Sequence, residues 1–222
     1  MAGRKSYNQN CPIARGLDVL GERWTLLILR ELIGGARRYG DVRAALPGIA
    51  TNLLADRLRE LEEAGLIRRN ELPPPVARTV YTLSEEGWRK VLPVIQAVAT
   101  FGLDLLEPSE SALTPLNGFL AGILLGFDPA RVSDLSASYR VEIDGRRFEF
   151  AATKAGLTAA EDPPAVTVTA TAADLITARL GGTPAERKAA LRRCKFDGPD
   201  AVVDAMRSAF QLTADPGLAL AN

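Results

Sequence analysis

The feature that most constrains the fold of this chain is a pair of short helix patterns followed by two strand patterns, all between residues 37 and 83. Apolar side chains recur at three- and four-residue spacing, which is typical of an amphipathic helix with one buried side. They are Tyr39, Val42 and Leu46 in the first pattern and Leu54, Leu58 and Leu61 in the second. Pro47 and Gly48 separate the two patterns, so a tight turn is expected between two helices.

The limits of the second helix and the strands after it complete this unit. Thr51 is expected to cap the helix, because its side-chain oxygen can accept a hydrogen bond from a first-turn backbone N–H. Gly65 is expected to end the helix in the left-handed conformation. Strands should follow from Leu66–Ile67 and over Thr79–Leu83, with the stiff segment Pro73–Pro75 between them. This order predicts a winged helix-turn-helix, whose second helix enters the major groove of DNA.

Seven side chains of this unit are candidates for contact with DNA. They are Arg37, Arg38, Thr51, Asn52, Arg57, Arg59 and Arg78. Thr51 and Asn52 begin the second helix, where they would reach base edges or phosphate. The arginines before the first helix, on the second helix and on the wing would contact the phosphate backbone or bases. Arg57 follows Leu54 by three residues, close to the buried stripe, and could instead pair with Glu60.

Separated motifs in the first half of the chain closely resemble those of the HxlR family of bacterial transcription regulators. The motifs are Cys11–Arg15, Gly21–Thr25, Leu27–Glu31, Pro47–Ile49, Leu58–Leu66 and Tyr81–Ser84. The resemblance covers roughly residues 8 to 105. It implies a winged helix protein that binds double-stranded DNA as a homodimer, with the first helix and the long helix after the wing building the dimer.

A long amphipathic helix is expected after a cap at Ser84. Its apolar positions are Trp88, Leu92, Ile95, Val98, Gly102 and Leu105. Such a stripe either packs into the core of its own domain or forms a symmetric interface with a second copy of the chain. The residues alone leave both arrangements open.

The length of the chain predicts a second folded domain, because 222 residues are about twice a minimal winged helix domain. We place the boundary after Glu107, which gives domains of residues 1–107 and 108–222. The net charge is zero, but residues 1–90 carry 15 Lys and Arg against 11 Asp and Glu, whereas residues 91–222 carry 12 against 16. The local positive excess is compatible with DNA binding.

The second half of the chain mixes helix and strand patterns. Asp144–Gly145 lies between two alternating segments and predicts a hairpin turn. Strands are expected at Tyr139–Ile143, Arg146–Phe150, Ala165–Ala170 and Lys195–Phe196, and helices at Leu116–Phe127, Ala172–Leu180 and Pro199–Leu212. We predict an α+β domain in which an antiparallel sheet carries helices on one side.

This half resembles, more loosely, the sterol carrier protein type two fold. The matching segments are Val166–Gly182, Arg193–Asp200 and the helix through Val203, Met206 and Phe210. The resemblance implies an apolar cavity for a lipid, a fatty acid or another flat apolar molecule. Its lining would be Phe119, Ile123, Phe127, Leu175, Ile176, Phe196, Met206 and Phe210. The same side chains could instead fill an ordinary core.

Other features argue against several classes of protein. No apolar run approaches the roughly 20 residues of a membrane span, and the N-terminus lacks the apolar core of a signal peptide, so we expect a cytoplasmic protein without membrane contact. Two cysteines and no histidine favour neither a disulfide scaffold nor a zinc site. No glycine-rich phosphate loop follows a strand, and the usual general base is missing. We therefore expect no enzyme activity, no metal and no cofactor.

Cys11 is a candidate for redox sensing. It precedes Pro12 at an expected helix start, where the helix dipole and Arg15 could lower the thiol pKa. The resemblance implies the same role, because several members of the family sense oxidants through a cysteine in this position. The alternative is a small apolar residue packed at the helix start. Cys194 is expected to be structural.

Together these patterns predict a transcription regulator that acts as a homodimer and responds to a small apolar ligand in its C-terminal domain. One alternative is a constitutive regulator whose C-terminal domain serves only assembly. Another is a lipid-binding protein whose winged helix mediates protein contacts.

Overall fold

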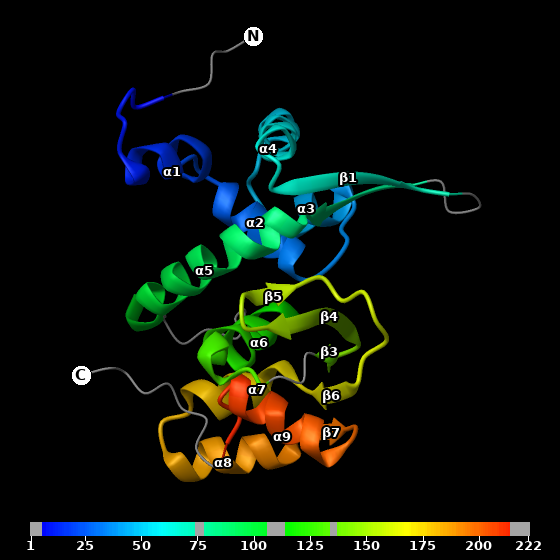
Figure 1. Cartoon of the computed structure of the whole chain (residues 1–222). Coiled ribbons are helices and arrows are strands. Elements are labelled where there is room, and N and C mark those ends of the chain that lie inside the picture. The colour runs from blue at the N-terminus through cyan, green and yellow to red at the C-terminus, as the bar shows by residue number, and fades with distance from the viewer. Residues whose placement is uncertain (1–5, 74–77, 106–113, 134–136, 214–222) are drawn as a thin grey trace. The chain divides into compact units, whose positions relative to one another are not determined.

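The computed structural model describes residues 6–73, 78–105, 114–133 and 137–213 (Figure 1). The chain divides into two compact units, residues 1–91 and 92–222. The boundary expected after Glu107 lies outside the described residues, as do Pro74 and Pro75 of the expected wing tip. Along the described segments, no helix combines the length and the apolar character that crossing a membrane would require.

The first unit is a winged helix-turn-helix. Its elements are α1 (Pro12–Leu20), α2 (Thr25–Ile33), α3 (Tyr39–Ala45), α4 (Thr51–Glu63), β1 (Ile67–Leu72), β2 (Arg78–Leu83) and the start of α5 (Glu85–Gly102). Its core includes Ile28, Leu29, Val42, Leu54 and Leu58, which are at most 1% exposed. Burying each leucine side chain stabilises the unit by about 2 kcal/mol. The helix stripes expected from the sequence are therefore the buried faces of α3 and α4.

The start of α4 differs from the expectation, because Thr51 does not cap the helix. The helix already includes Thr51, and Ala50 occupies the cap position in an extended conformation without a side-chain hydrogen bond. The Tyr39 hydroxyl donates instead to the backbone carbonyl of Thr51 over 2.7 Å. The first turn of α4 is thus braced by a side chain from α3.

The end of α4 agrees with the expectation. Gly65 has a φ of 71°, in the left-handed region. The N–H of Leu66 donates to the carbonyl of Leu61 and the N–H of Gly65 to that of Glu62, which is the Schellman pattern of a glycine-terminated helix. This cap turns the chain directly into β1.

The wing is the antiparallel pair of β1 and β2, which extends from the helices in Figure 1. Its register runs from Ile67 opposite Leu83 to Leu72 opposite Arg78. Arg37 adds a further bridge: its N–H donates to the carbonyl of Tyr81, and the N–H of Tyr81 donates back to the carbonyl of Arg37. The segment before α3 is therefore paired with β2.

Helix α5 begins as predicted at a serine cap. The N–H of Gly87 donates to Ser84 Oγ over 2.9 Å, and Ser84 Oγ donates to the Gly65 carbonyl over 2.5 Å. Trp88 is 5% exposed and Val91 is fully buried. The serine therefore ties the start of α5 to the end of α4.

The second unit is an α+β domain. Besides the end of α5 and η1 (Leu103–Leu105), its helices are α6 (Pro115–Gly122), η3 (Leu124–Gly126), η4 (Pro129–Arg131), α7 (Ala172–Leu180), α8 (Pro184–Arg193) and α9 (Asp200–Ala209). Its strands are β3 (Ala137–Ile143), β4 (Arg146–Thr153), β5 (Gly156–Thr158), β6 (Val166–Ala170) and β7 (Lys195–Asp197), in the order β5-β4-β3-β6-β7. Neither α8 nor β5 was expected from the sequence.

The sheet is mixed, which corrects the prediction of an antiparallel one. The predicted hairpin of β3 and β4 is present. Strand β5 occupies the free edge of β4, so β6 pairs with the other edge of β3 and runs parallel to it. The chain between β5 and β6 must therefore cross to the far side of the hairpin.

Glycines also divide the long helix expected from Leu116 to Phe127. Helix α6 ends at Gly122 and is followed by the short η3. A Cβ at Gly118 would lie 2.8 Å from the Cα of Ala172, and one at Gly122 would lie 2.6 Å from the Cβ of Leu175. These glycines allow α6 to approach α7 closely.

Candidate nucleic-acid interface

Helix α4 presents one polar face to solvent. Asn52, Ala55 and Arg59 are exposed at positions that share one side of the helix, while Leu54 and Leu58 are buried on the other. Thr51 is also exposed, at the first helical position. A face of this kind can enter a groove of DNA without any rearrangement of the core.

Arg59 is the more exposed of the two arginines on α4. Its side chain is 64% exposed and pairs with Asp56 over 3.0 Å and with Glu63 over 3.8 Å. Exposed ion pairs of this kind contribute little to stability, because both groups remain hydrated. Arg59 could therefore exchange these carboxylates for a phosphate.

Arg57 lies in a different environment. Its side chain is 15% exposed, forms an ion pair with Glu60, and approaches Glu22 Oε2 to 3.4 Å. The pairing with Glu60 is the alternative that the helix spacing allowed. Glu22 lies between α1 and α2, so Arg57 links α4 to the preceding helices.

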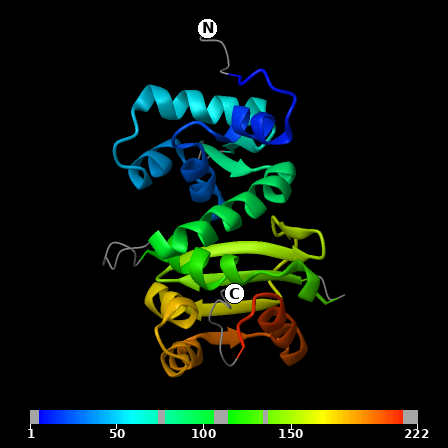
Figure 2. The same cartoon turned by 90° about the vertical axis from the view of Figure 1, so that its left-hand side faces the viewer.

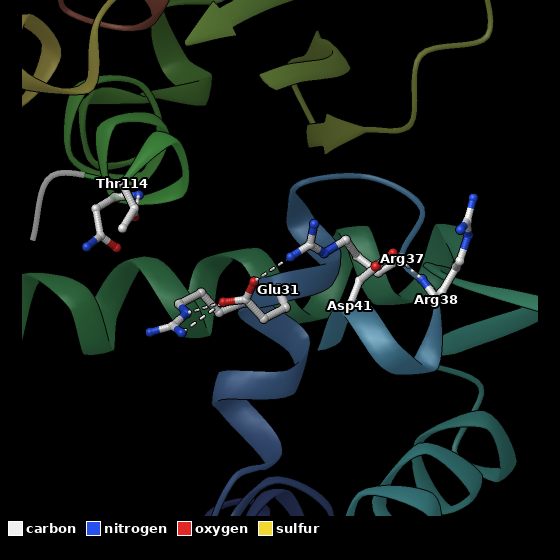
Figure 3. A network of polar contacts seen from close by, with 7 residues as sticks. Glu31, Arg37, Arg38, Asp41 and Thr114 are labelled. Atoms are coloured by element: carbon white, nitrogen blue, oxygen red, sulfur yellow. Dashed lines mark hydrogen bonds and ion pairs between the residues drawn. The ribbon is translucent and has the colours of Figure 1, made fainter. Parts of the chain in front are cut away.

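The two arginines before α3 also differ in the surroundings of their side chains. Glu31 is 3% exposed and accepts hydrogen bonds from Arg30 over 2.9 Å and from Arg37 Nη2 over 3.4 Å. Figure 3 shows the Arg37 guanidinium directed at Glu31, whereas the Arg38 side chain points away from this carboxylate. The backbone N–H of Arg38 donates to Asp41, and its side chain is exposed. Of the pair, Arg38 is the one available to a partner.

The wing and α3 add further exposed cations. Arg78 is exposed at the start of β2, where it pairs with Leu72 across the ribbon. Arg43 on α3 and Arg68 on β1 are exposed, and neither has an ion pair within the described part of the chain; both were overlooked in the sequence. Arg43 lies next to Val42 just off the apolar stripe of α3, which is the signal that could have identified it.

The side chains expected to line an apolar cavity lie in the core of the second unit. Phe119, Ile123, Phe127, Leu175, Met206 and Phe210 are at most 8% exposed, and Ile176 and Phe196 are half-buried. Helix α6 covers one face of the sheet (Figure 2), and there the Phe119 ring stacks on Phe148 at 4.5 Å between centroids. The centroid of the Phe210 ring lies 5.1 to 5.9 Å from those of Phe127, Tyr139 and Phe150. This packing corresponds to the alternative of an ordinary core, and the rings from the hairpin were not anticipated.

A buried cation lies beside this core. Arg179 is 2% exposed, and its Nη2 donates to the carbonyls of Gly122 over 3.1 Å and Phe210 over 2.9 Å. Burial lowers the pKa of Arg179 to about 10, because the charged form loses its hydration. These two hydrogen bonds link the end of α6 to the residue that follows α9.

The two cysteines differ in environment. The backbone N–H groups of Ala14 and Ile13 at the start of α1 stabilise the thiolate and lower the pKa of Cys11, which is partly exposed. Burial raises the pKa of Cys194 to about 11, assisted by the charge of Asp174. No group of three or more residues that could hold a metal ion occurs among the described residues.

Comparison with known proteins agrees with the geometry of the first unit. Residues 19–110 match the family described as HxlR-like helix-turn-helix. The HTH-type transcriptional regulator sll1512 of Synechocystis sp. is 41% identical over 108 residues, covering 49% of this chain and 79% of that protein. The chain belongs to the HxlR family.

A second relative is a transcriptional regulator with a solved structure. The HTH-type transcriptional regulator YodB of Bacillus subtilis is 31% identical over 105 residues, covering 47% of this chain and 93% of YodB. The structure of reduced YodB matches with a TM-score of 0.39 and 31% identity, covering 46% of this chain and all of that one. This HxlR-family chain is thus a DNA-binding transcription regulator rather than an enzyme. Residues 111–222 lie outside the range that the family covers.

Proposed function

We propose that the protein acts as a homodimer that places its two α4 helices in successive major grooves of an operator, about 34 Å apart. The observation that carries this proposal is the exposed face of α4, with Asn52 and Arg59 on one side and a fully buried leucine stripe on the other. Because that stripe anchors the helix, its polar side chains have a defined position before any DNA arrives.

Five exposed side chains have assigned roles in this proposal. Thr51 and Asn52 read base edges or contact phosphate at the N-terminal end of α4. Arg38, Arg59 and Arg78 contact the backbone from the entry to α3, from α4 and from the wing. Arg37 and Arg57 are given structural roles here, because their guanidinium groups already face Glu31 and the pair Glu22 and Glu60.

The direct test is Asn52→Ala. Operator sites are first selected from a random DNA pool with the wild-type chain, and affinities are then measured by fluorescence anisotropy. The variant should lose about 1–3 kcal/mol on the selected site and discriminate less between single-base variants of it. Asn10→Ala, which changes an exposed asparagine outside the helix-turn-helix, is the control and should bind as the wild type does. Unchanged affinity of Asn52→Ala for every sequence would remove this residue from base reading, and a selection without enrichment would favour the protein-contact alternative.

The homodimer is supported by exposed apolar side chains. On the last turns of α5, Val98 is 48% exposed and Phe101 is 79% exposed, and Leu105 follows at 70% in η1. Gln96, on the opposite side of α5, donates to the carbonyls of Leu124 and Phe127. The helix is therefore held by one side and leaves an apolar side in water, which favours contact with a second copy.

Cys11 is proposed as an oxidant-reactive thiol. Because backbone N–H groups lower the pKa of Cys11, its modification by iodoacetamide should rise with pH through a midpoint below that of an ordinary thiol. Cys194 is buried, and its pKa is raised to about 11, so it should stay unmodified in the folded protein at neutral pH. Mass spectrometry of the two cysteine peptides checks both expectations. Equal modification of the two thiols, or a Cys11 midpoint at or above that of a free thiol, would contradict the proposal.

A response to an apolar ligand in the C-terminal unit stays a prediction from the sequence. The rings of Phe119, Phe148 and Phe210 pack against their neighbours, so a ligand would have to separate them. Native mass spectrometry of the full chain tests this response: one bound apolar molecule per protomer supports it, and the bare dimer mass favours a constitutive regulator with an assembly module.

A further inference from the structure

Helices α8 and α9, at the C-terminal end of the colour range in Figure 1, contribute to one groove with a volume of about 470 Å³. Lys188, Leu191 and Arg192 line it from α8, and Asp204, Arg207 and Ser208 line it from α9. In both helices the spacing is three and four residues, so each helix turns a single face toward the groove. Leu212 and Thr213 complete the lining.

The cations of this groove differ from several exposed arginines in the same unit. Arg131, Arg140, Arg147 and Arg193 each form an ion pair with a carboxylate, at 2.6 to 3.1 Å. Lys188, Arg192 and Arg207 have no such pair anywhere in the described residues. Three positively charged side chains therefore line the groove together with one carboxylate, that of Asp204.

Arg207 is held in place without its charge being neutralised. Its guanidinium carbon lies 4.4 Å from the centroid of the Phe196 ring, which favours a fixed position for the cation. Its Nε is buried and has no acceptor among the described residues. A guanidinium that is oriented but lacks a carboxylate is suited to accept an anion from outside, because little side-chain freedom remains to be lost.

The helix dipoles explain the positions of these cations only in part. Arg192 and Arg207 lie in the last turns of α8 and α9, where cations favour the helix dipole. Lys188 lies a full turn earlier, and the dipole does not require the cations of two helices to face the same hollow. The groove also contains the partly exposed apolar side chain of Leu191, which a purely ionic surface would not need; Leu212, at 1% exposed, lies beneath it.

We propose that the groove between α8 and α9 is a binding site for a small organic carboxylate, whose charged group contacts Arg192 and Arg207 and whose apolar part lies on Leu191. Guanidinium groups bind carboxylates through two parallel hydrogen bonds, which gives the charged end of the ligand a defined orientation. Lys188 adds attraction as a point charge, and Ser208 and Thr213 supply hydroxyl groups. The site is separate from the ring cluster of the core, and its existence does not depend on DNA binding.

The test uses the full chain and three probes of related size or charge. Hexanoate carries both a carboxylate and an apolar body, hexan-1-ol carries only the apolar body, and inorganic phosphate carries only charge. Isothermal titration calorimetry should show saturable binding of hexanoate at about one molecule per protomer, with much weaker binding of the other two. The variants Arg192→Gln and Arg207→Gln should each weaken hexanoate binding by about tenfold or more, the loss expected for a charged hydrogen bond.

Arg193→Gln is the matched control. Arg193 belongs to the same last turn of α8 but pairs with Asp174, and it does not line the groove. The control should bind hexanoate within about twofold of the wild type. Because Arg207 also contacts Phe196, Arg192→Gln is the decisive variant if Arg207→Gln lowers the unfolding temperature.

Three results would overturn the proposal. The first is the absence of saturable hexanoate binding, and the second is binding that survives the double variant Arg192→Gln, Arg207→Gln. The third is phosphate binding as tight as that of hexanoate, since the groove would then select charge alone. In each case operator binding by the first unit would be unaffected, so that failure here is distinguishable from failure of the regulator function.

Discussion

Replacing Val98 and Phe101 together by glutamate is expected to convert the proposed homodimer into a monomer. Both side chains are exposed on the same side of α5, and in a twofold interface each substitution occurs twice. Four carboxylates would then have to enter an apolar contact, where desolvation and mutual repulsion oppose their burial. Size-exclusion chromatography with light scattering should show the monomer mass.

The same variant should lose operator affinity by about a hundredfold or more, because the second half-site is no longer bound by a tethered copy. Thr100→Glu is the matched control. Thr100 is exposed on the side of α5 that carries Gln96, and its hydroxyl donates a hydrogen bond to the Gln96 carbonyl. It should remain dimeric and bind DNA normally. A double variant that stays dimeric would show that the exposed side chains of α5 do not form the interface.

Gly87→Ala should strongly destabilise the first unit. A Cβ at Gly87 would lie 2.0 Å from the backbone carbonyl oxygen of Leu66 and 3.3 Å from Ser84 Oγ. That carbonyl is itself engaged by the N–H of Ser84, so neither group can move without breaking the junction between α4, β1 and α5. Forced overpacking at a backbone contact of this kind costs about 3 kcal/mol.

Tryptophan fluorescence is the appropriate measurement for Gly87→Ala. Both tryptophans of the chain, Trp24 and Trp88, belong to the first unit, so urea unfolding followed by their emission reports that unit. Gly16→Ala is the control: Gly16 lies within α1, and among the described residues no atom beyond its chain neighbours and its own helix backbone lies within 4 Å of the added Cβ. The control should be unchanged or more stable by up to about 1 kcal/mol, because alanine favours the helix. Equal unfolding midpoints for the two variants would mean that the close contact at Gly87 can relax.

Local patterns predicted the first unit well, because its elements are set by side chains close in sequence. The stripes of α3 and α4, the glycine end of α4 at Gly65 and the serine cap of α5 at Ser84 depend on spacings of three or four residues. Thr51 was wrong as a cap because the segment before it, at Ala50, is already extended and lets the helix begin one residue earlier. A capping residue can be recognised from sequence, but the neighbouring element decides whether it is used.

The second unit was predicted less completely. Helix α8 starts with a capping box, in which Thr183 accepts from the N–H of Glu186 and Glu186 accepts from the N–H of Thr183. That threonine–glutamate spacing was visible but was overlooked, because α8 has only a weak apolar face. The parallel pairing of β3 with β6 depends instead on which sheet edge β5 leaves free, and no local pattern contains this information.

In the candidate site, too, contacts between residues close in sequence were predictable and contacts between distant residues were not. The spacing of Arg57 to Glu60 was readable along one helix, whereas Glu22 lies 35 residues away and meets Arg57 only in the folded unit. Likewise, nothing near Arg37 in sequence shows that its backbone pairs with Tyr81. Burial and pairing of an arginine are tertiary properties, so a count of basic residues cannot say which of them face DNA.

The bridge between Arg37 and Tyr81, with the hydrogen bond from Tyr39 to Thr51, has a consequence for the encounter with DNA. The wing, the entry to α3 and the first turn of α4 are fastened to one another within the free protomer. Most of the conformational entropy of arranging these surfaces is therefore lost when the chain folds rather than when it meets an operator. In the proposed complex, the wing, α3 and α4 would therefore dock as one preassembled body, and induced fit would fall chiefly on exposed side chains and on the DNA itself.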